Sequence, residues 1–238
     1  IDAMRDIIKK APNEPYLLKI YADMLLEHKL LEEAAKVYDE AASLYHKNGK
    51  MLSAIVAKIS QWHYEMPSGQ SIKIFFSDLK KNIKKDLPIN NLFSKLSIEE
   101  LKSFCFLFEK VRLPADHTIK EIGDVEHHLF LIVSGRLEDS IYLTLQNQEK
   151  IFRKPTIILS ENDYFGEIYP FTKEQRCQSY IKTLRPTELV SISKEKLLPI
   201  CRKFPNIELA IIDLLKIRSQ FTTSDSSAKL RRSPRYEF

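Results

Sequence analysis

The sequence predicts an α+β fold, in which N-terminal antiparallel helical hairpins precede a β jelly-roll barrel with flanking helices. Up to about Pro67, apolar and small residues recur at the spacing that places them on one face of a helix. From Val111 to Ile192, short β-branched and aromatic segments alternate with turn residues instead. Many short strands at close spacing are typical of sandwiches and barrels, so this change of period marks a change of domain.

The N-terminal helices form a hairpin with a break at Glu27–Lys29. The stretch from Pro15 to Ala41 resembles a tetratricopeptide repeat, because small and aromatic residues occupy the motif's positions at Ala22, Ala34, Tyr38 and Ala41. A weaker copy runs from Gly49 to Pro67. The resemblance implies a protein partner bound through the repeats. The alternative is a plain helical hairpin packed on the next domain.

Further along the chain, turn and capping signals separate the expected elements. Ser97 with Glu100 forms a capping box that starts a helix, and Ser193 is the expected N-cap of another. Pro205 separates a short helix from a longer one over Ile207–Gln220. Between these helices six segments are predicted to be strands: residues 118–122, 128–133, 140–145, 154–159, 179–184 and 188–192.

Composition favours a folded protein of a reducing compartment. The 238 residues are 44% hydrophobic, which is enough for one large domain or two small ones with a real core. The three cysteines are widely spaced and form no C-x-x-C pair, which argues against a disulfide framework or a zinc site. Without a signal peptide or a bilayer-spanning apolar run, we expect a cytoplasmic protein. The chain begins with Ile1, so we expect a piece of a longer or processed protein.

The net charge of +5 is mild and comes partly from two basic runs, residues 80–85 and 229–235. Neither run has the interleaved aromatic residues of a surface that follows a phosphate backbone. A solvated helix face or a linker is therefore favoured over nucleic-acid binding.

The residues that carry chemistry lie between Phe165 and Ser179. A glycine, Gly166, precedes Glu167, and Arg176 follows Glu167 nine positions later. An arginine fork can hold two oxygens of one phosphate, a contact that lysine cannot make. A carboxylate can accept a hydrogen bond from a ribose hydroxyl, and a glycine lets backbone approach a ligand closely.

With its surroundings, this stretch resembles the phosphate-binding cassette of the cyclic-nucleotide-binding family, which includes catabolite activators. The segments 113–119, 122–124 and 129–135 resemble the family's first strands and turn glycines. The resemblance implies a regulatory module of a bacterial-type signalling protein, without catalytic activity or a further cofactor. It implies that Arg176 holds the phosphate and Glu167 the ribose, and that the ligand-binding set is Phe165, Gly166, Glu167, Ile168, Arg176, Cys177 and Gln178.

Several residues depart from the family pattern. Cys177 and Gln178 stand where small residues are usual, Pro170 lies inside the cassette, and Asn162 stands near a customary glycine. Intact binding of a cyclic nucleotide is favoured over a vestigial fold that serves as a protein-interaction scaffold. Cyclic AMP is favoured over cyclic GMP, because Cys177 lacks the hydroxyl that reaches guanine in the family.

Other motifs do not point to an enzyme or a metal site. The pair His127-His128 has no supporting ligand spacing and is interpreted as a solvent-facing pair. The chain contains no P-loop, no G-x-S-x-G and no H-E-x-x-H.

The C-terminal stretch from Lys229 to Phe238 resembles the opening of a PilZ domain, whose two arginines, here Arg231 and Arg235, clamp cyclic di-GMP. A basic tail is the alternative. The predicted organisation is thus helical repeats over 1–67, a helical linker over 68–90, a cyclic-nucleotide-binding domain over 91–220, and a linker with the start of a PilZ domain over 221–238.

Overall fold

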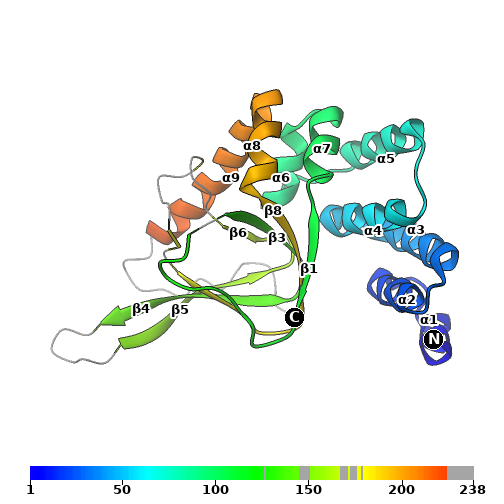
Figure 1. Ribbon diagram of the computed structural model, residues 1–238, viewed down its shortest axis with the longest axis horizontal. Coiled ribbons are helices and arrows are strands. Elements are labelled where there is room, and N and C mark those ends of the chain that lie inside the picture. Colours follow the sequence, from blue (N-terminus) through cyan, green and yellow to red (C-terminus); the bar gives the residue numbers. More distant parts are fainter. Residues whose placement is uncertain (126, 145–150, 167–170, 172–175, 178, 224–238) are drawn as a thin grey trace. The chain divides into compact units, whose positions relative to one another are not determined.

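The computed structural model describes residues 1–125, 127–144, 151–166, 171, 176–177 and 179–223 (Figure 1). They form two compact units. The first consists of Ile1–Asp86 with Ser97–Phe106, and the second of Leu87–Leu96 with the chain from Leu107 onward. Within the described part of the chain, no helix is long and apolar enough to cross a membrane.

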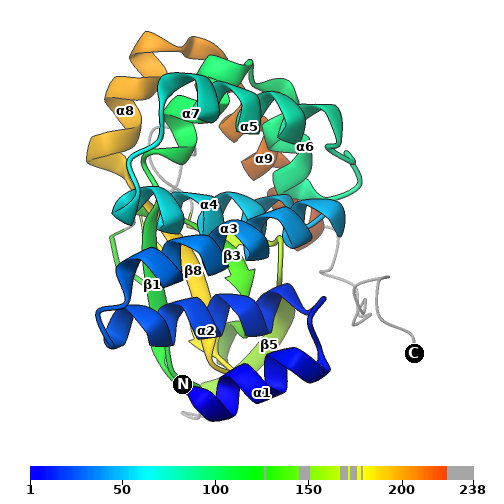
Figure 2. The same ribbon diagram turned by 90° about the vertical axis from the view of Figure 1, so that its right-hand side faces the viewer.

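The first unit is entirely helical. Figure 2 shows its first four helices stacked one on the next, with consecutive helices running in opposite directions. Its helices are α1 (Asp2–Lys10), α2 (Pro15–Glu27), α3 (Leu31–Lys47), α4 (Met51–Tyr64), α5 (Gly69–Lys81) and α7 (Ile98–Cys105).

Small side chains bring α2 and α3 together. Ala22 and Ala34 are fully buried, and they pack with Tyr38 in one core cluster. The turn between the helices needs a left-handed residue, which is Lys29 with a φ of 62°. The helical hairpin therefore has the break that the sequence predicts, while its assignment as a tetratricopeptide repeat stays a prediction.

The capping box at the start of α7 is confirmed. The Ser97 hydroxyl accepts a hydrogen bond from the Glu100 amide at 3.2 Å, and the Glu100 carboxylate accepts one from the Ser97 amide at 2.7 Å. Two amides that the helix itself cannot satisfy are thereby paired.

The second unit holds two antiparallel four-stranded sheets, with strand orders β1-β8-β3-β6 and β2-β7-β4-β5. The predicted α+β class is confirmed, but the described strands form two open sheets and no closed barrel. The strands β1 and β6 were not among the six predicted. The bounds are β1 (Glu109–Leu113), β2 (Thr118–Lys120), β3 (His128–Ser134), β4 (Arg136–Thr144), β5 (Ile151–Ser160), β6 (Tyr164–Phe165), β7 (Tyr180–Thr183) and β8 (Thr187–Ser193).

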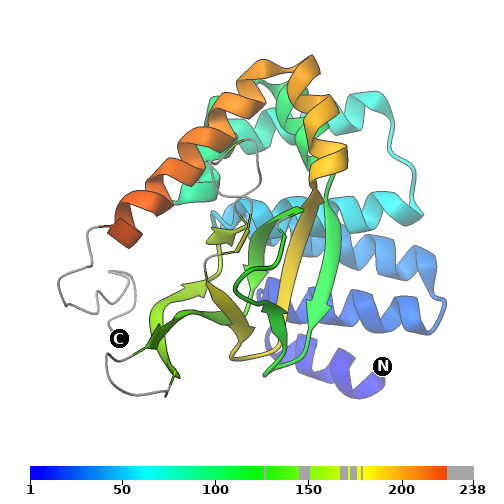
Figure 3. The ribbon, with the colours of Figure 1, turned by 60° about the vertical axis from the view of Figure 1, so that its left-hand side comes forward.

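The strands of the two sheets can be followed in Figure 3. An apolar core of buried side chains lies between the sheets. Phe165 and Leu189 come from one sheet, and Leu137 and Ile181 come from the other. All four side chains are buried, so the packing of these residues holds the sheets face to face.

Turns with positive φ set the ends of the strands. Gly135, between β3 and β4, has a φ of 108°, and a Cβ there would lie 2.4 Å from the Thr187 hydroxyl oxygen. Asn162 has a φ of 66° in the turn before β6. Because asparagine tolerates the left-handed region better than most residues, it replaces the glycine that is usual near this turn.

Three helices complete the second unit: α6 (Pro88–Lys95), α8 (Lys194–Lys203) and α9 (Pro205–Thr223). The Ser193 hydroxyl caps α8 as predicted, accepting a hydrogen bond from the Lys196 amide at 3.4 Å. Lys95 of α6 forms an ion pair with Asp213 of α9 at 3.0 Å. Helix α9 is also tied to β6, because the Tyr164 hydroxyl donates a hydrogen bond to the Leu214 carbonyl.

Candidate functional site

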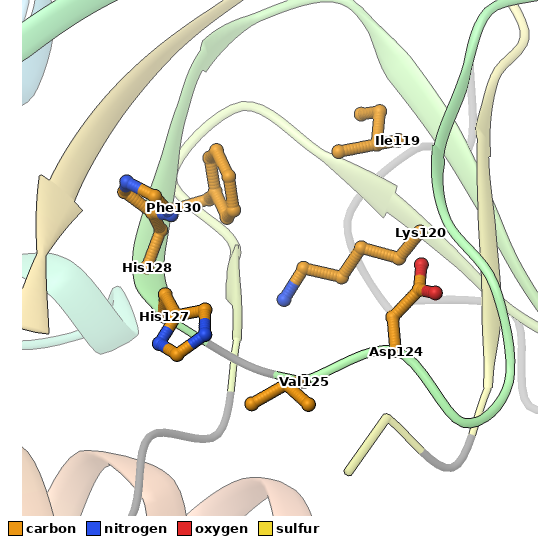
Figure 4. Close-up of a pocket in the computed structure, with 7 residues that line it drawn as sticks. All are labelled: Ile119, Lys120, Asp124, Val125, His127, His128 and Phe130. Atoms are coloured by element: carbon orange, nitrogen blue, oxygen red, sulfur yellow. The ribbon is translucent and has the colours of Figure 1, made fainter.

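A cavity of about 300 Å³ opens beside β2 and β3 in the second unit (Figure 4). It mixes apolar walls with cationic and imidazole groups, a composition suited to an organic anion. The described residues that line it are Ile119, Lys120, Asp124, Val125, His127, His128 and Phe130.

The aromatic wall of the cavity leads directly to the predicted cassette. The Phe130 ring stacks on the Phe165 ring, with centroids 4.7 Å apart and planes at 13°. Phe165 is fully buried, and its neighbour Gly166 is buried with a φ of 99°. A Cβ at Gly166 would lie 2.2 Å from the His128 carbonyl oxygen, so only glycine fits here.

Lys120 extends from β2 across the cavity, with its ammonium group on the side of Phe130 (Figure 4). The residue is only 7% exposed. Its Nζ lies 5.2 Å from the Phe130 ring centroid and 5.4 Å from that of Phe165. It also lies 3.2 Å from the place of a Cβ on Gly166. A cation therefore occupies the wall beside the first residues of the cassette.

The end of the cassette is held by the turn around Gly123, which has a φ of 94°. The Gly123 amide donates to the Cys177 carbonyl at 2.9 Å, and the Cys177 amide donates to the Asp124 carbonyl at 2.8 Å. The Arg176 side chain donates from Nη1 to the Gly123 carbonyl at 2.6 Å and is exposed. Arg176 is not among the described residues that line the cavity.

Cys177 is buried, and its thiol donates a hydrogen bond to the Ser179 carbonyl at 2.9 Å. The sulfur thus makes a local contact with the backbone. The other two cysteines are buried elsewhere, and burial raises the pKa of both thiols, that of Cys201 to about 12 with a further contribution from Glu208. Such thiols stay protonated and unreactive at neutral pH.

The two histidines of the cavity differ in their surroundings. His127 is exposed, whereas His128 is half-buried and its ring packs at 5.8 Å from that of Phe130. Burial is the main cause that lowers the pKa of His128, and the positive charge of Lys120 contributes in the same direction. The prediction of a solvent-facing pair therefore holds for one of the two side chains.

The structure brings together Phe165, Gly166, Arg176 and Cys177 around the cavity and its neighbouring turn. The remaining predicted site residues lie outside the described residues: Glu167, Ile168 and Gln178 of the cassette, and Arg231 and Arg235 of the tail. In the described part of the chain, no group of three or more metal-ligating side chains is present.

Sequence reasoning missed Lys120, because a lysine in a short strand is normally taken to face solvent. The register of β2 against β7 shifts between Thr118 and Lys120, so strict alternation of faces breaks down at this point. The closeness of Lys120 to Gly123 in the sequence is the only signal that connects this lysine with the site.

Comparison with known protein families defines the class of this unit. Residues 110–204 match the family model of the cyclic nucleotide-binding domain. That range includes the cavity lining and the whole cassette. This segment of the chain is therefore a cyclic nucleotide-binding domain. A search of curated protein sequences finds no match for the chain.

One solved structure shows the same fold, and a second is similar in part. A cyclic nucleotide-binding domain from Methylobacillus flagellatus KT aligns with a TM-score of 0.50 and 17% identity, over 68% of this chain and 88% of that one. The catabolite activator protein of Thermus thermophilus aligns with a TM-score of 0.47 and 23% identity, over 56% of this chain and 60% of that one. The chain thus spans 60% of the length of the Thermus protein.

Proposed function

We propose that this chain is a signalling regulator that binds a 3′,5′-cyclic nucleotide at the cavity beside β2 and β3. The observation that carries the proposal is the Phe165–Gly166 corner, which leads from the cavity wall into the cassette within the segment that matches the family. Gly166 brings backbone to the edge of the cavity at a point where no other residue fits.

Two side chains supply the polar contacts in this proposal. Arg176 binds the cyclic phosphate, after exchanging its contact with the Gly123 carbonyl for the charged ligand. Glu167 accepts a hydrogen bond from the ribose hydroxyl. Cyclic AMP is the favoured ligand over cyclic GMP, which the local hydrogen bond of the Cys177 thiol supports, since this residue offers no hydroxyl to a guanine.

The proposed output is a movement of α9 and not a chemical reaction. Helix α9 contacts β6 through the Tyr164 hydroxyl, next to Phe165 and Gly166. A ligand that binds one position of α9 better than another shifts the population toward that position. This shift of α9 then alters the attached helical unit or a further output domain. Protein binding through the helical hairpins belongs to the same proposal.

Isothermal titration of the 238-residue chain with cyclic AMP and cyclic GMP tests the proposal directly. We expect binding in the micromolar range, with cyclic AMP the tighter ligand. Arg176→Glu should abolish it, because the variant places a carboxylate opposite the phosphate.

The matched control is Arg185→Glu, which reverses an exposed arginine of the same unit and should leave the affinity unchanged. Both variants need a circular dichroism spectrum and a melting curve like those of the parent chain. Absence of heat with either nucleotide on folded protein would reject the proposal.

A protein-interaction scaffold with a vestigial domain is the second candidate. Its support is the Arg176 guanidinium, which is exposed and donates to the Gly123 carbonyl. In that case the same partner proteins should be retained on the immobilised chain with and without cyclic nucleotide. A nucleotide-dependent change in the retained set would favour the first candidate.

A further inference from the structure

Lys120 is unusual for its position in the fold. The residue is 7% exposed, and its ammonium group lies inside a cavity between the two sheets. Lysine is almost never fully buried unless its charge is compensated, because the ammonium loses its hydration. Its place on the cavity wall and the two aromatic rings beside it make Lys120 a candidate for ligand binding.

Two aromatic faces position the charged end. The Nζ is 5.2 Å from the centroid of Phe130 and 5.4 Å from that of Phe165, distances at which a cation is attracted to the ring. The two rings stack on each other, so they form a rigid surface for the ammonium group. The side chain is thereby directed toward the corner at Gly166 and away from open solvent.

The ammonium group of Lys120 lies beside the first residues of the cassette. The Nζ lies 3.2 Å from the site of a Cβ on Gly166, so a ligand group placed against that backbone meets the ammonium. The guanidinium of Arg176 lies elsewhere, since it is exposed and donates to the Gly123 carbonyl at 2.6 Å. Among the described residues that line the cavity, Lys120 is thus the only lysine or arginine.

The other polar groups of the lining are two imidazoles, which can donate to an anion, and one carboxylate, which cannot. His127 and His128 offer imidazole nitrogens. The carboxylate of Asp124 accepts a hydrogen bond from the Glu121 amide at 2.8 Å, which fixes it in its own turn.

We propose that Lys120 binds an anionic oxygen of the nucleotide's phosphate and gives the cavity its preference for a charged nucleotide over the uncharged nucleoside. This inference rests on the proposed function and adds a second cation to it. An ammonium is a compact charge with three rotatable donors, so it accepts phosphodiesters and phosphomonoesters alike.

The test compares Lys120→Met with the parent chain. Methionine keeps an unbranched stem of similar length and removes the charge. Lys196→Met is the matched control, because it removes one charge from a lysine of the same unit whose side chain is 55% exposed. Each protein is titrated with cyclic AMP, cyclic GMP, 5′-AMP, inorganic phosphate and adenosine. Should Lys120→Met fail to fold, Lys120→Gln carries the same expectation.

We expect Lys120→Met to weaken cyclic AMP and 5′-AMP by about 10- to 100-fold, the range of a hydrogen bond to a charged group, and to leave adenosine unchanged. Lys196→Met should resemble the parent. Unchanged affinity for the anions in Lys120→Met would overturn the inference and leave the proposed function standing. An equal loss for adenosine would also overturn it, because Lys120 would then only shape the cavity.

The remaining outcomes separate the two proposals. If the parent binds 5′-AMP or phosphate in a manner that needs Lys120, but binds neither cyclic nucleotide, the inference stands and the proposed function fails. If the parent binds none of the anions, both fail.

Discussion

Gly166 carries two constraints at once. Its φ of 99° lies in a region that residues with a Cβ rarely adopt, and a Cβ would lie 2.2 Å from the His128 carbonyl oxygen. The first constraint could be met at a strain of about 1–3 kcal/mol. The second requires the backbone of β3 or β6 to move, so the corner of the cavity depends on this one residue.

Gly166→Ala should therefore lower the free energy of unfolding by about 1–3 kcal/mol or more, measured by urea denaturation. It should also weaken nucleotide binding, because Phe165, which stacks on Phe130 of the cavity wall, shifts. The control is Gly69→Ala at the start of α5, where no atom lies within 4 Å of the added Cβ. That change should be neutral or stabilise by a few tenths of a kcal/mol to about 1 kcal/mol. Equal effects of the two substitutions would contradict this reasoning.

At the same scale, sequence and structure agree on the glycines and differ on the charges. Gly123, Gly135 and Gly166 are predictable as turns because a glycine between strand-like segments has few other roles, and all three have positive φ. The contact of Lys120 with two rings is not predictable, because it depends on a register shift and on residues that are distant in the chain. Pairings of that kind arise only from the tertiary fold.

Among the elements, those with a capping residue or a clear period follow from the sequence, whereas the strands β1 and β6 do not. The capping residues Ser97 and Ser193 start helices where predicted, because their hydroxyls act on amides three residues away. The strand β6 has two residues, too few for any period, and exists because it pairs with β3. The six predicted strands contain or overlap observed ones, but separation into two sheets depends on long-range pairing.

Helix α9 provides a test of whether ligand binding beside the sheets changes the position of this helix. The Tyr164 hydroxyl donates to the Leu214 carbonyl, and both residues are buried. Tyr164→Phe removes this link and should cost about 0.5–1.5 kcal/mol of stability, the net value of a hydrogen bond. If α9 moves with the ligand, the variant should also reduce the difference in hydrogen exchange over 205–216 between free and nucleotide-bound chain.

Tyr180→Phe is the control for this experiment. It removes a hydroxyl that contacts the Thr118 hydroxyl at 2.6 Å, so it loses a comparable bond in the same unit without involving α9. A similar change of hydrogen exchange in α9 for both variants would mean that the hydrogen bond of Tyr164 does not itself transmit ligand binding to α9.

At the scale of the whole molecule, His128 couples stability to pH. Its pKa lies below the usual 6.5, first because of burial and also because of the charges of Lys120 and His127, while Glu109 and Glu195 act in the opposite direction. The unfolded chain therefore binds a proton at this residue at a higher pH than the folded chain does. By linkage, the folded state loses stability as pH falls through 6.5, and the loss ends below the pKa of the folded state.

Chemical unfolding of the chain at a series of pH values from 8 to about 5 should show this loss, since carboxylates near their usual pKa of about 4 contribute little in that range. His128→Gln should flatten the curve, because glutamine does not titrate. His117→Gln, at an exposed histidine of the same unit, is the matched control for the loss of an imidazole. A bound anion at Lys120 would offset the positive charge beside His128, so saturating cyclic AMP, whose phosphodiester does not titrate in this range, should reduce the slope in the parent chain. An unchanged slope in His128→Gln would assign the pH dependence to other groups.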